Sequence, residues 1–158
     1  MWMSGMITTM LLAVSCTTLD CPLNNTTLAK YMLQGDVRTL DDTLTVSTKR
    51  SLDGSDTVLV NRQVGTDSLM LPMSYANRED VLFFTRTTQY GVTTRDTVTI
   101  SKTDEPHFES IDCNPSFFHT INGIDYTTNG IDSIVIHHRN VTYDASKTHF
   151  YIYFSQLD

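Results

Sequence analysis

From Leu28 to the end of the chain, apolar residues recur at every second position over short stretches. The clearest examples are Leu44 and Val46; Leu69, Leu71 and Met73; Val98 and Ile100; Ile134 and Ile136; and Phe150, Ile152 and Phe154. Successive side chains of a β-strand point to opposite faces, so this period places one face in a core and the other in solvent. Threonine, which favours strands, occurs 25 times and alanine, which favours helices, 4 times. The pattern predicts a chain built from short β-strands.

Turn-forming dipeptides separate these stretches. They are Asp53-Gly54, Val64-Gly65, Tyr90-Gly91, Asn122-Gly123 and Asn129-Gly130. No stretch of about twelve residues or more shows the periodicity of an amphipathic helix. Seven to nine short strands at such intervals predict an all-β fold, a single antiparallel β-sandwich that is immunoglobulin-like or similar. A chain of 158 residues suits one domain, which we expect to cover 28-158.

The last two strands are expected to form a hairpin. Ile131–His138 and His149–Phe154 flank the loop Arg139–Thr148. A shift of one residue in the pairing would place core positions opposite solvent positions. We therefore expect a register in which Ile136 faces Phe150 and Ile134 faces Ile152 on the core side.

The opposite face of this hairpin is the candidate ligand-binding face. In the same register it carries His137 opposite His149, Val135 opposite Tyr151, and Ser133 opposite Tyr153. Tyrosine rings on a flat strand face can stack on sugar rings or anchor a protein partner. The alternative is that Tyr151 and Tyr153 pack beneath a loop or only stabilise the sheet through cross-strand pairs.

An apolar run from Met6 to Ser15 precedes Cys16. Ten residues are too few to span a hydrocarbon core of about 30 Å, but they suit the apolar region of a signal peptide. Small residues directly before a cysteine are typical of the lipobox, where the cut leaves an N-terminal cysteine that carries lipid. We predict a lipoprotein signal peptide at 1-15, lipidation of Cys16 and a polar tether at 16-27. The alternative is a buried N-terminal strand, since no Lys or Arg precedes Lys30, unless Met1 is not the true start.

Two further cysteines form an even pair. With Cys16 lipidated, Cys21 and Cys113 remain for a disulfide in an oxidising compartment. The bridge would close a loop of about 93 residues, worth roughly 4–5 kcal/mol in the chain-entropy model. Neither cysteine has a second Cys or His at zinc-ligand spacing. Two buried free thiols are the alternative.

Charge and motifs argue against several functions. The formal net charge of −7 argues against nucleic-acid binding, which needs clustered Lys and Arg. The chain has no G-x-S-x-G, H-E-x-x-H or C-x-x-C motif and no glycine-rich phosphate loop. We expect no enzymatic activity, no catalytic residue and no cofactor. His137 and His149, with Asp144, are too few ligands for tetrahedral zinc, so we expect no metal.

Acidic clusters also admit a calcium interpretation. Asp53-Gly54-Ser55-Asp56 places two carboxylates around a glycine, but it lacks the ligand spacing of an EF-hand loop. A hairpin turn explains the same residues without a metal. Asp104-Glu105, next to Pro106, is expected to lie in a solvated loop.

Several short motifs together resemble a known family. They are Ala13-Val14-Ser15-Cys16, Cys21-Pro22, Leu69-Met70-Leu71-Pro72, Asp96-Thr97-Val98-Thr99-Ile100, Cys113, Ile131-Asp132-Ser133-Ile134 and the ending His149–Phe154. The chain resembles a family of small uncharacterised lipoproteins of gut Bacteroidota, defined as a domain of unknown function. The resemblance implies an envelope location and an all-β domain, and it brings no known activity.

Together these observations predict a lipid-anchored protein of the cell envelope. We expect the N-terminal lipid to anchor the protein in the outer membrane, with the domain on the periplasmic or the surface-exposed side. The expected function is non-catalytic binding or scaffolding, with an envelope protein or a glycan as partner and no nucleic acid. The alternatives are a glycan-binding accessory protein and a small hydrolase with an unrecognised site. A glycan binder should show an exposed aromatic face, and a hydrolase should show a pocket with converging titratable groups.

Overall fold

The computed structural model describes residue 21, residues 26–50 and residues 53–157. The predicted signal peptide and the predicted lipidation site Cys16 lie outside these residues. The described chain folds into ten β-strands and no helix, so it contains no helix long and apolar enough to cross a membrane. The strands are β1 (Leu28–Gln34), β2 (Thr43–Lys49), β3 (Asp56–Gln63), β4 (Ser68–Pro72), β5 (Glu79–Thr87), β6 (Thr93–His107), β7 (Ser116–Tyr126), β8 (Ile131–Ile136), β9 (Asn140–Val141) and β10 (Phe150–Phe154).

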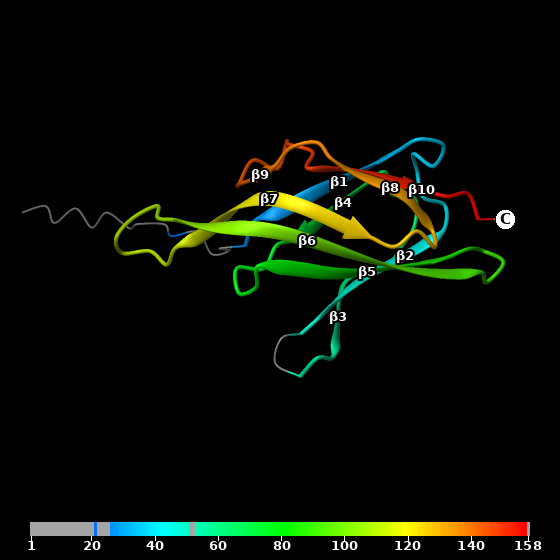
Figure 1. The fold of residues 1–158 in the computed structure, drawn as a ribbon, viewed down its shortest axis with the longest axis horizontal. Coiled ribbons are helices and arrows are strands. Elements are labelled where there is room, and N and C mark those ends of the chain that lie inside the picture. The colour runs from blue at the N-terminus through cyan, green and yellow to red at the C-terminus, as the bar shows by residue number, and fades with distance from the viewer. Residues whose placement is uncertain (1–20, 22–25, 51–52, 158) are drawn as a thin grey trace, which may run out of the picture.

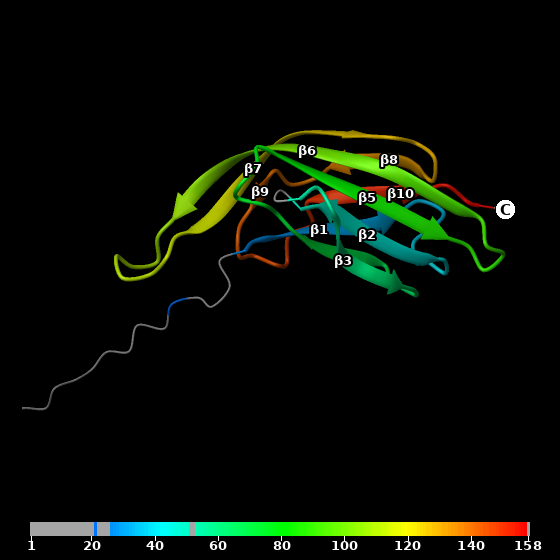
Figure 2. The same ribbon diagram turned by 90° about the horizontal axis from the view of Figure 1, so that it is seen from below.

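The strands form two packed sheets (Figures 1 and 2). One sheet has four strands in the order β4-β1-β10-β8, and the other has six in the order β3-β2-β5-β6-β7-β9. The predicted all-β sandwich is confirmed, with two corrections. There are ten strands rather than seven to nine, and the β1–β10 pair is parallel whereas all the other strand pairs are antiparallel.

Two segments predicted as connections are in strands instead. The expected loop Arg139–Thr148 contains β9, which leaves the β8–β10 hairpin and pairs with His119 and Thr120 of the other sheet. The expected turn at Asn122-Gly123 lies inside β7, where the pairing with β6 shifts between Ser101 and Lys102. The Asn-Gly pair therefore marks an irregularity within a long strand, a position where glycine is common.

The core lies between the two sheets. Tyr31 of β1 stacks on Phe150 of β10 with ring centroids 4.6 Å apart, and its ring lies 6.1 Å from that of Phe84 in β5. All three side chains are buried. The other large apolar side chains that are fully buried include Leu40, Leu44, Val46, Leu71, Ile100, Ile121, Ile131 and Ile152. Each large apolar side chain contributes about 1.5–3 kcal/mol by leaving water, so alternation in the sequence is sufficient to specify this interior.

A buried polar network closes one end of the sandwich. Arg86 of β5 donates from Nε to Asp42 at 2.8 Å and from Nη2 to the carbonyl of Ser155 at 2.7 Å. Asp96 of β6 accepts four hydrogen bonds at 2.6–3.0 Å, of which three come from backbone amides. The donors are Thr127 Oγ1 and the amides of Asn129, Gly130 and Ile131. We call this region, around Arg86 and Asp96, the distal end.

Candidate functional site

The predicted register of the β8–β10 hairpin is confirmed. Ile136 pairs with Phe150, Val135 with Tyr151, Ile134 with Ile152, and Ser133 with Tyr153. Phe150 and Ile152 are fully buried, so the other side of the hairpin points out of the sandwich. The hydrophobic pattern alone was sufficient to fix this pairing.

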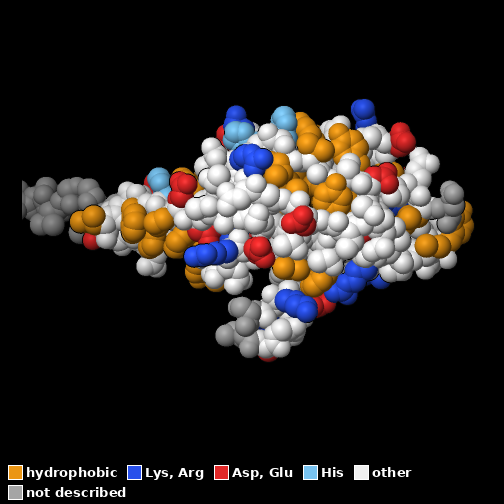
Figure 3. All heavy atoms as spheres, in the orientation of Figure 1, with side chains coloured by type: hydrophobic (Ala, Val, Ile, Leu, Met, Phe, Trp, Pro, Cys, Tyr) orange, Lys and Arg blue, Asp and Glu red, His pale blue; other side chains and the backbone are white. Residues whose placement is uncertain are grey.

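The outward side chains of the four-stranded sheet form one continuous surface. Met32 of β1 pairs with Tyr151, Tyr151 pairs with Val135, and Lys30 pairs with Met70 of β4. We define the outer face as Leu28, Lys30, Met32, Met70, Val135, His137, Tyr151 and Tyr153, so that one lysine lies among its apolar side chains. Leu28 and Met70 are each 40% exposed and Val135 is 48% exposed. Figure 3 shows hydrophobic side chains gathered over the region of β8.

The two tyrosines of the outer face have different surroundings. The ring of Tyr151 lies 4.5 Å from that of His137, which is exposed. Tyr153 packs over Gly35, where an added Cβ would lie 2.9 Å from its ring. Beside Tyr153 is a cavity of about 170 Å³ that is lined by polar side chains, among them Gln34, Asp36, Asp132 and Gln156.

His149 does not lie on the outer face. Its side chain is buried, and its Nδ1 accepts a hydrogen bond of 2.9 Å from the backbone amide of Lys30. His137 and His149 were expected to face each other across the hairpin. Their backbones are paired, since the amide of His137 donates to the carbonyl of His149 at 2.8 Å, but their side chains do not share a face. Burial lowers the pKa of His149, so the ring is neutral at pH 7. The structure therefore brings together three of the four predicted face residues.

The six-stranded sheet presents a more polar surface. Its outward positions on β2, β5 and β6 are rich in threonine, including the directly paired Thr45 and Thr85. An outward aromatic residue, Phe83, is covered by cations: the guanidinium of Arg95 lies 4.4 Å from the ring centroid and the ammonium of Lys49 lies 6.0 Å from it. Exposed aliphatic side chains thus distinguish the outer face from the surface of β2, β5 and β6, although Val58 of β3 in the same six-stranded sheet is 53% exposed.

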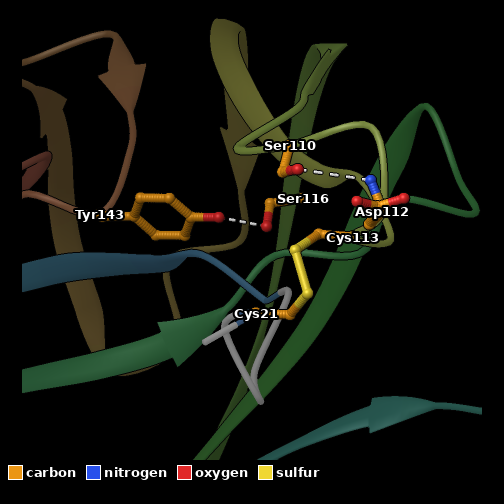
Figure 4. Close-up of a disulfide and its surroundings, with 6 residues drawn as sticks. All are labelled: Cys21, Ser110, Asp112, Cys113, Ser116 and Tyr143. Carbon is orange, nitrogen blue, oxygen red and sulfur yellow. Dashed lines mark hydrogen bonds between the residues drawn. A yellow bond between two sulfur atoms is a disulfide. The ribbon is translucent and has the colours of Figure 1, made fainter. Parts of the chain in front are cut away.

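The predicted disulfide is confirmed. Cys21 and Cys113 are joined with a Cα–Cα distance of 5.5 Å (Figure 4). Cys113 lies in the turn between β6 and β7, so the bond ties the segment before β1 to the tip of the longest hairpin. Beside it the hydroxyl of Tyr143 contacts Ser116 Oγ (Figure 4).

A second cluster of buried polar side chains, centred on Lys102, lies between the core and this disulfide. Lys102 donates from Nζ to the carbonyl of Ser74, to the carbonyl of Asn77 at 2.6 Å and to Asp104 at 2.9 Å. His119 donates from Nδ1 to the same Asp104 oxygen at 2.6 Å, and burial lowers the pKa of His119. The expectation that Asp104 lies in a solvated loop was wrong, because β6 extends to His107 and the carboxylate is needed to pair a buried lysine.

Asp80 of β5 is the least well satisfied charge in this group. Its Oδ2 accepts one hydrogen bond of 3.2 Å from the amide of Ser74, and its side chain is buried. Burial raises the pKa of Asp80 from 3.8 to about 6, against the opposing effect of Lys102. We call the region of the disulfide, Asp80, Lys102, Asp104 and His119 the disulfide end.

Several titratable groups line one cavity of the described chain. This cavity, of about 320 Å³ at the distal end, is lined by Asp36, Asp41, Asp42 and Arg86, and Arg86 is paired with Asp42. A cavity of about 240 Å³ near the β4–β5 connection is mainly apolar, and Asp80 is the one carboxylate among its described lining residues. An open groove of about 1140 Å³ lies next to it and includes Lys49, Arg50 and Arg78. Among the described residues, no three His, Cys, Asp or Glu side chains are placed to share a metal ion.

At Asp53 the predicted turn is present, since its carboxylate accepts hydrogen bonds from the amide and hydroxyl of Ser55.

Comparison with known proteins identifies a family. No curated protein and no solved structure is significantly similar to the chain. A family model matches residues 43–154, which run from the first residue of β2 to the last residue of β10. The chain therefore belongs to DUF6452, a family of unknown function.

Proposed function

We propose that this protein is a non-catalytic binding or scaffolding module held at the cell envelope by lipid on Cys16. The outer face of the four-stranded sheet is its binding surface, and a protein of the envelope is its partner. The observation that carries the proposal is the composition of this face. It exposes Leu28, Met70 and Val135, with Tyr151 and His137 packed on each other and Lys30 among the apolar side chains, and contiguous exposed apolar surface marks interaction sites.

The kind of side chain favours a protein partner. Met32 and Met70 lie on the outer face with Tyr151 between Met32 and Val135. Methionine adapts to irregular apolar surfaces, and tyrosine is enriched among the residues that dominate protein interfaces. The ring of His137 lies 4.5 Å from that of Tyr151, which leaves less of the tyrosine ring free for stacking on a sugar.

Two observations support the envelope location. Disulfides persist in oxidising compartments such as the periplasm, and Cys21–Cys113 braces this domain. The motifs that resemble lipoproteins of gut Bacteroidota place Cys16 five residues before this bridge. The anchor is tested by labelling with radioactive palmitate. We expect label in the wild-type chain and none after Cys16→Ala, and unlabelled, unprocessed wild-type protein would contradict the anchor.

The binding surface is tested by adding charge to one sheet or to the other. Val135→Glu changes an exposed residue of the edge strand β8 that pairs with Tyr151, and Thr85→Glu is the matched change on the six-stranded sheet. We expect Val135→Glu to shift the protein from a larger complex to its own size on native gels of solubilised envelopes. Thr85→Glu should leave the complex intact. Loss of the complex in both variants or in neither would contradict the assignment of this face.

The cavity beside Tyr153 favours a second candidate, carbohydrate binding. Amide and carboxylate side chains around one ring are typical of sites that hydrogen-bond sugar hydroxyls. Its volume of about 170 Å³ is below the roughly 300–1,000 Å³ usual for small-molecule sites, which places this candidate second. Replacing Tyr151 and Tyr153 with Ala should abolish retention on immobilised envelope polysaccharide if this candidate is right. Retention by neither wild type nor variant would exclude it.

A further inference from the structure

The turn between β6 and β7 presents apolar side chains that have no role in the core. Phe108 is 62% exposed and Ile111 is 97% exposed. Nearby, Tyr75 is 63% exposed and stacks on Phe117 with ring centroids 5.1 Å apart. The hairpin projects beyond both sheets at the left of Figure 1, and Figure 3 shows hydrophobic side chains along it and at its tip.

The disulfide fixes where the N-terminal segment meets the domain. Cys113 follows Ile111 by two residues and is bonded to Cys21, so residue 21 is held at this turn (Figure 4). Five residues separate Cys16 from Cys21, a reach of at most about 18 Å in a fully extended chain. If Cys16 carries acyl chains, the turn cannot lie further than this reach from the bilayer surface.

The charges of the hairpin indicate which lipids it tolerates. From Asp104 to Ser116 the chain has the acidic residues Asp104, Glu105, Glu109 and Asp112 and no Lys or Arg. A segment of this kind gains nothing from anionic headgroups, which attract basic residues. Its contact with a membrane must therefore come from apolar insertion among zwitterionic headgroups.

We infer that the β6–β7 turn is a second membrane contact, in which Phe108 and Ile111 insert into the interface of a bilayer rich in phosphatidylethanolamine. This inference rests on the proposed anchor at Cys16. Stable membrane attachment takes two signals, and a turn held beside the anchor supplies the second one. The same contact orients the domain, with the disulfide end on the membrane and the distal end away from it.

The inference is tested with tryptophan as a depth reporter in protein expressed from the complete sequence and purified from membranes. Phe108→Trp and Ile111→Trp place the reporter in the turn. Tyr90→Trp is the matched control, because Tyr90 is 80% exposed in the β5–β6 turn at the other end of the sandwich (Figure 1). Each variant is reconstituted into phosphatidylethanolamine vesicles with brominated acyl chains. The cut before Cys16 removes Trp2, the one tryptophan of the wild-type sequence, so the introduced tryptophan is the sole reporter in acylated protein. Mass spectrometry of the same samples records whether Cys16 is acylated.

We expect acylated protein with a blue-shifted emission and roughly two-fold quenching for the reporters at 108 and 111, and no quenching at 90. Acylated protein in which all three positions are quenched equally, or none is quenched, would overturn the membrane contact and leave the anchor standing. Protein that is not acylated would overturn the anchor together with the contact that rests on it.

Discussion

The two ends of the sandwich both bury charge, but they do so differently. At the distal end Asp96 accepts four hydrogen bonds and Arg86 is paired with Asp42 and a backbone carbonyl. At the disulfide end Asp80 accepts one long hydrogen bond and keeps a raised pKa. Folding alone would favour the first arrangement at both ends, since an incompletely satisfied buried carboxylate is costly.

The difference indicates that the two ends of the sandwich have different roles. At the distal end the buried charges of Arg86 and Asp96 have their partners, although the buried hydroxyl of Thr94, beside Gly130, has none. The disulfide end has a crowded set of buried charges, a covalent bond and exposed apolar residues at Phe108 and Ile111. Departures from well-satisfied packing are most often retained where a protein functions. This contrast fits a molecule held to the membrane at one end and closed at the other.

The largest loss of stability is expected at Asp96. Asp96→Asn removes the charge and turns an amide group toward backbone N–H donors, leaving buried donors without a partner. We expect a loss of about 3–5 kcal/mol in the free energy of unfolding, measured with urea. Asp132→Asn is the control, because Asp132 is exposed and accepts from Ser155 Oγ, and it should cost about 1 kcal/mol or less. Equal losses in the two variants would remove the distinction claimed for the distal end.

Breaking the disulfide should have the next largest effect. Replacing both Cys21 and Cys113 with Ser releases a loop closed over a sequence separation of 92 residues. We expect a loss of about 2–4 kcal/mol in urea unfolding, the range usual for disulfides and less than the roughly 4–5 kcal/mol of the chain-entropy model, and a similar loss for the wild type under reducing agent. Cys16→Ser should unfold like the wild type in detergent. Unchanged stability after reduction would show that the bond does not brace the domain.

At Asp80 we expect a gain in stability. The pKa of Asp80 is about 6 in the folded protein and 3.8 ordinarily, so the folded state binds this proton more tightly. Its contribution to stability is therefore fully present below about pH 4 and is lost as the pH rises to about 6. Asp80→Asn should raise the free energy of unfolding by roughly 1–2 kcal/mol at pH 8, after allowance for solvent screening, and change it little at pH 4. A variant less stable than the wild type at pH 8 would show that Asp80 stabilises the fold as an anion.

The smallest effect on stability is expected in the β6–β7 turn. Phe108→Ser combined with Ile111→Ser removes exposed side chains, so the free energy of unfolding should change by no more than about 0.5 kcal/mol. Tyr90→Ser in the β5–β6 turn is the matched change at the other end. A loss above about 2 kcal/mol for the double variant alone would mean that these residues serve the fold rather than a membrane contact.

The fold was predictable from the sequence where alternation was regular. The β8–β10 register followed from Ile134, Ile136, Phe150 and Ile152, because a slip by one residue would have exposed all four. The pairing of Cys21 with Cys113 followed from counting cysteines. The parallel pairing of β1 with β10 has no local signal, since it joins strands more than 110 residues apart and depends on the whole topology.

The candidate surfaces were only partly predictable. Tyr151 and Tyr153 point outward as their strand alternation indicated, but His149 is buried because β1 supplies a backbone partner for its ring. Leu28, Met32 and Met70 of the outer face come from β1 and β4, whose positions in the sheet next to the β8–β10 hairpin are set by tertiary structure. The buried group around Lys102 was missed, although a lysine inside an alternating strand, between Ile100 and Asp104, was a signal that could have been used.

The most direct test of the proposed binding function is in vivo photo-crosslinking from the two faces of the sandwich. A photoreactive amino acid is placed at Val135 on the outer face, and at Thr85 on the six-stranded sheet as the matched position. We expect one discrete adduct with an envelope protein from position 135, its loss when Tyr151→Glu is added, and no such adduct from position 85. The same adducts from both positions, or an adduct from position 85 alone, would contradict a binding surface on the four-stranded sheet.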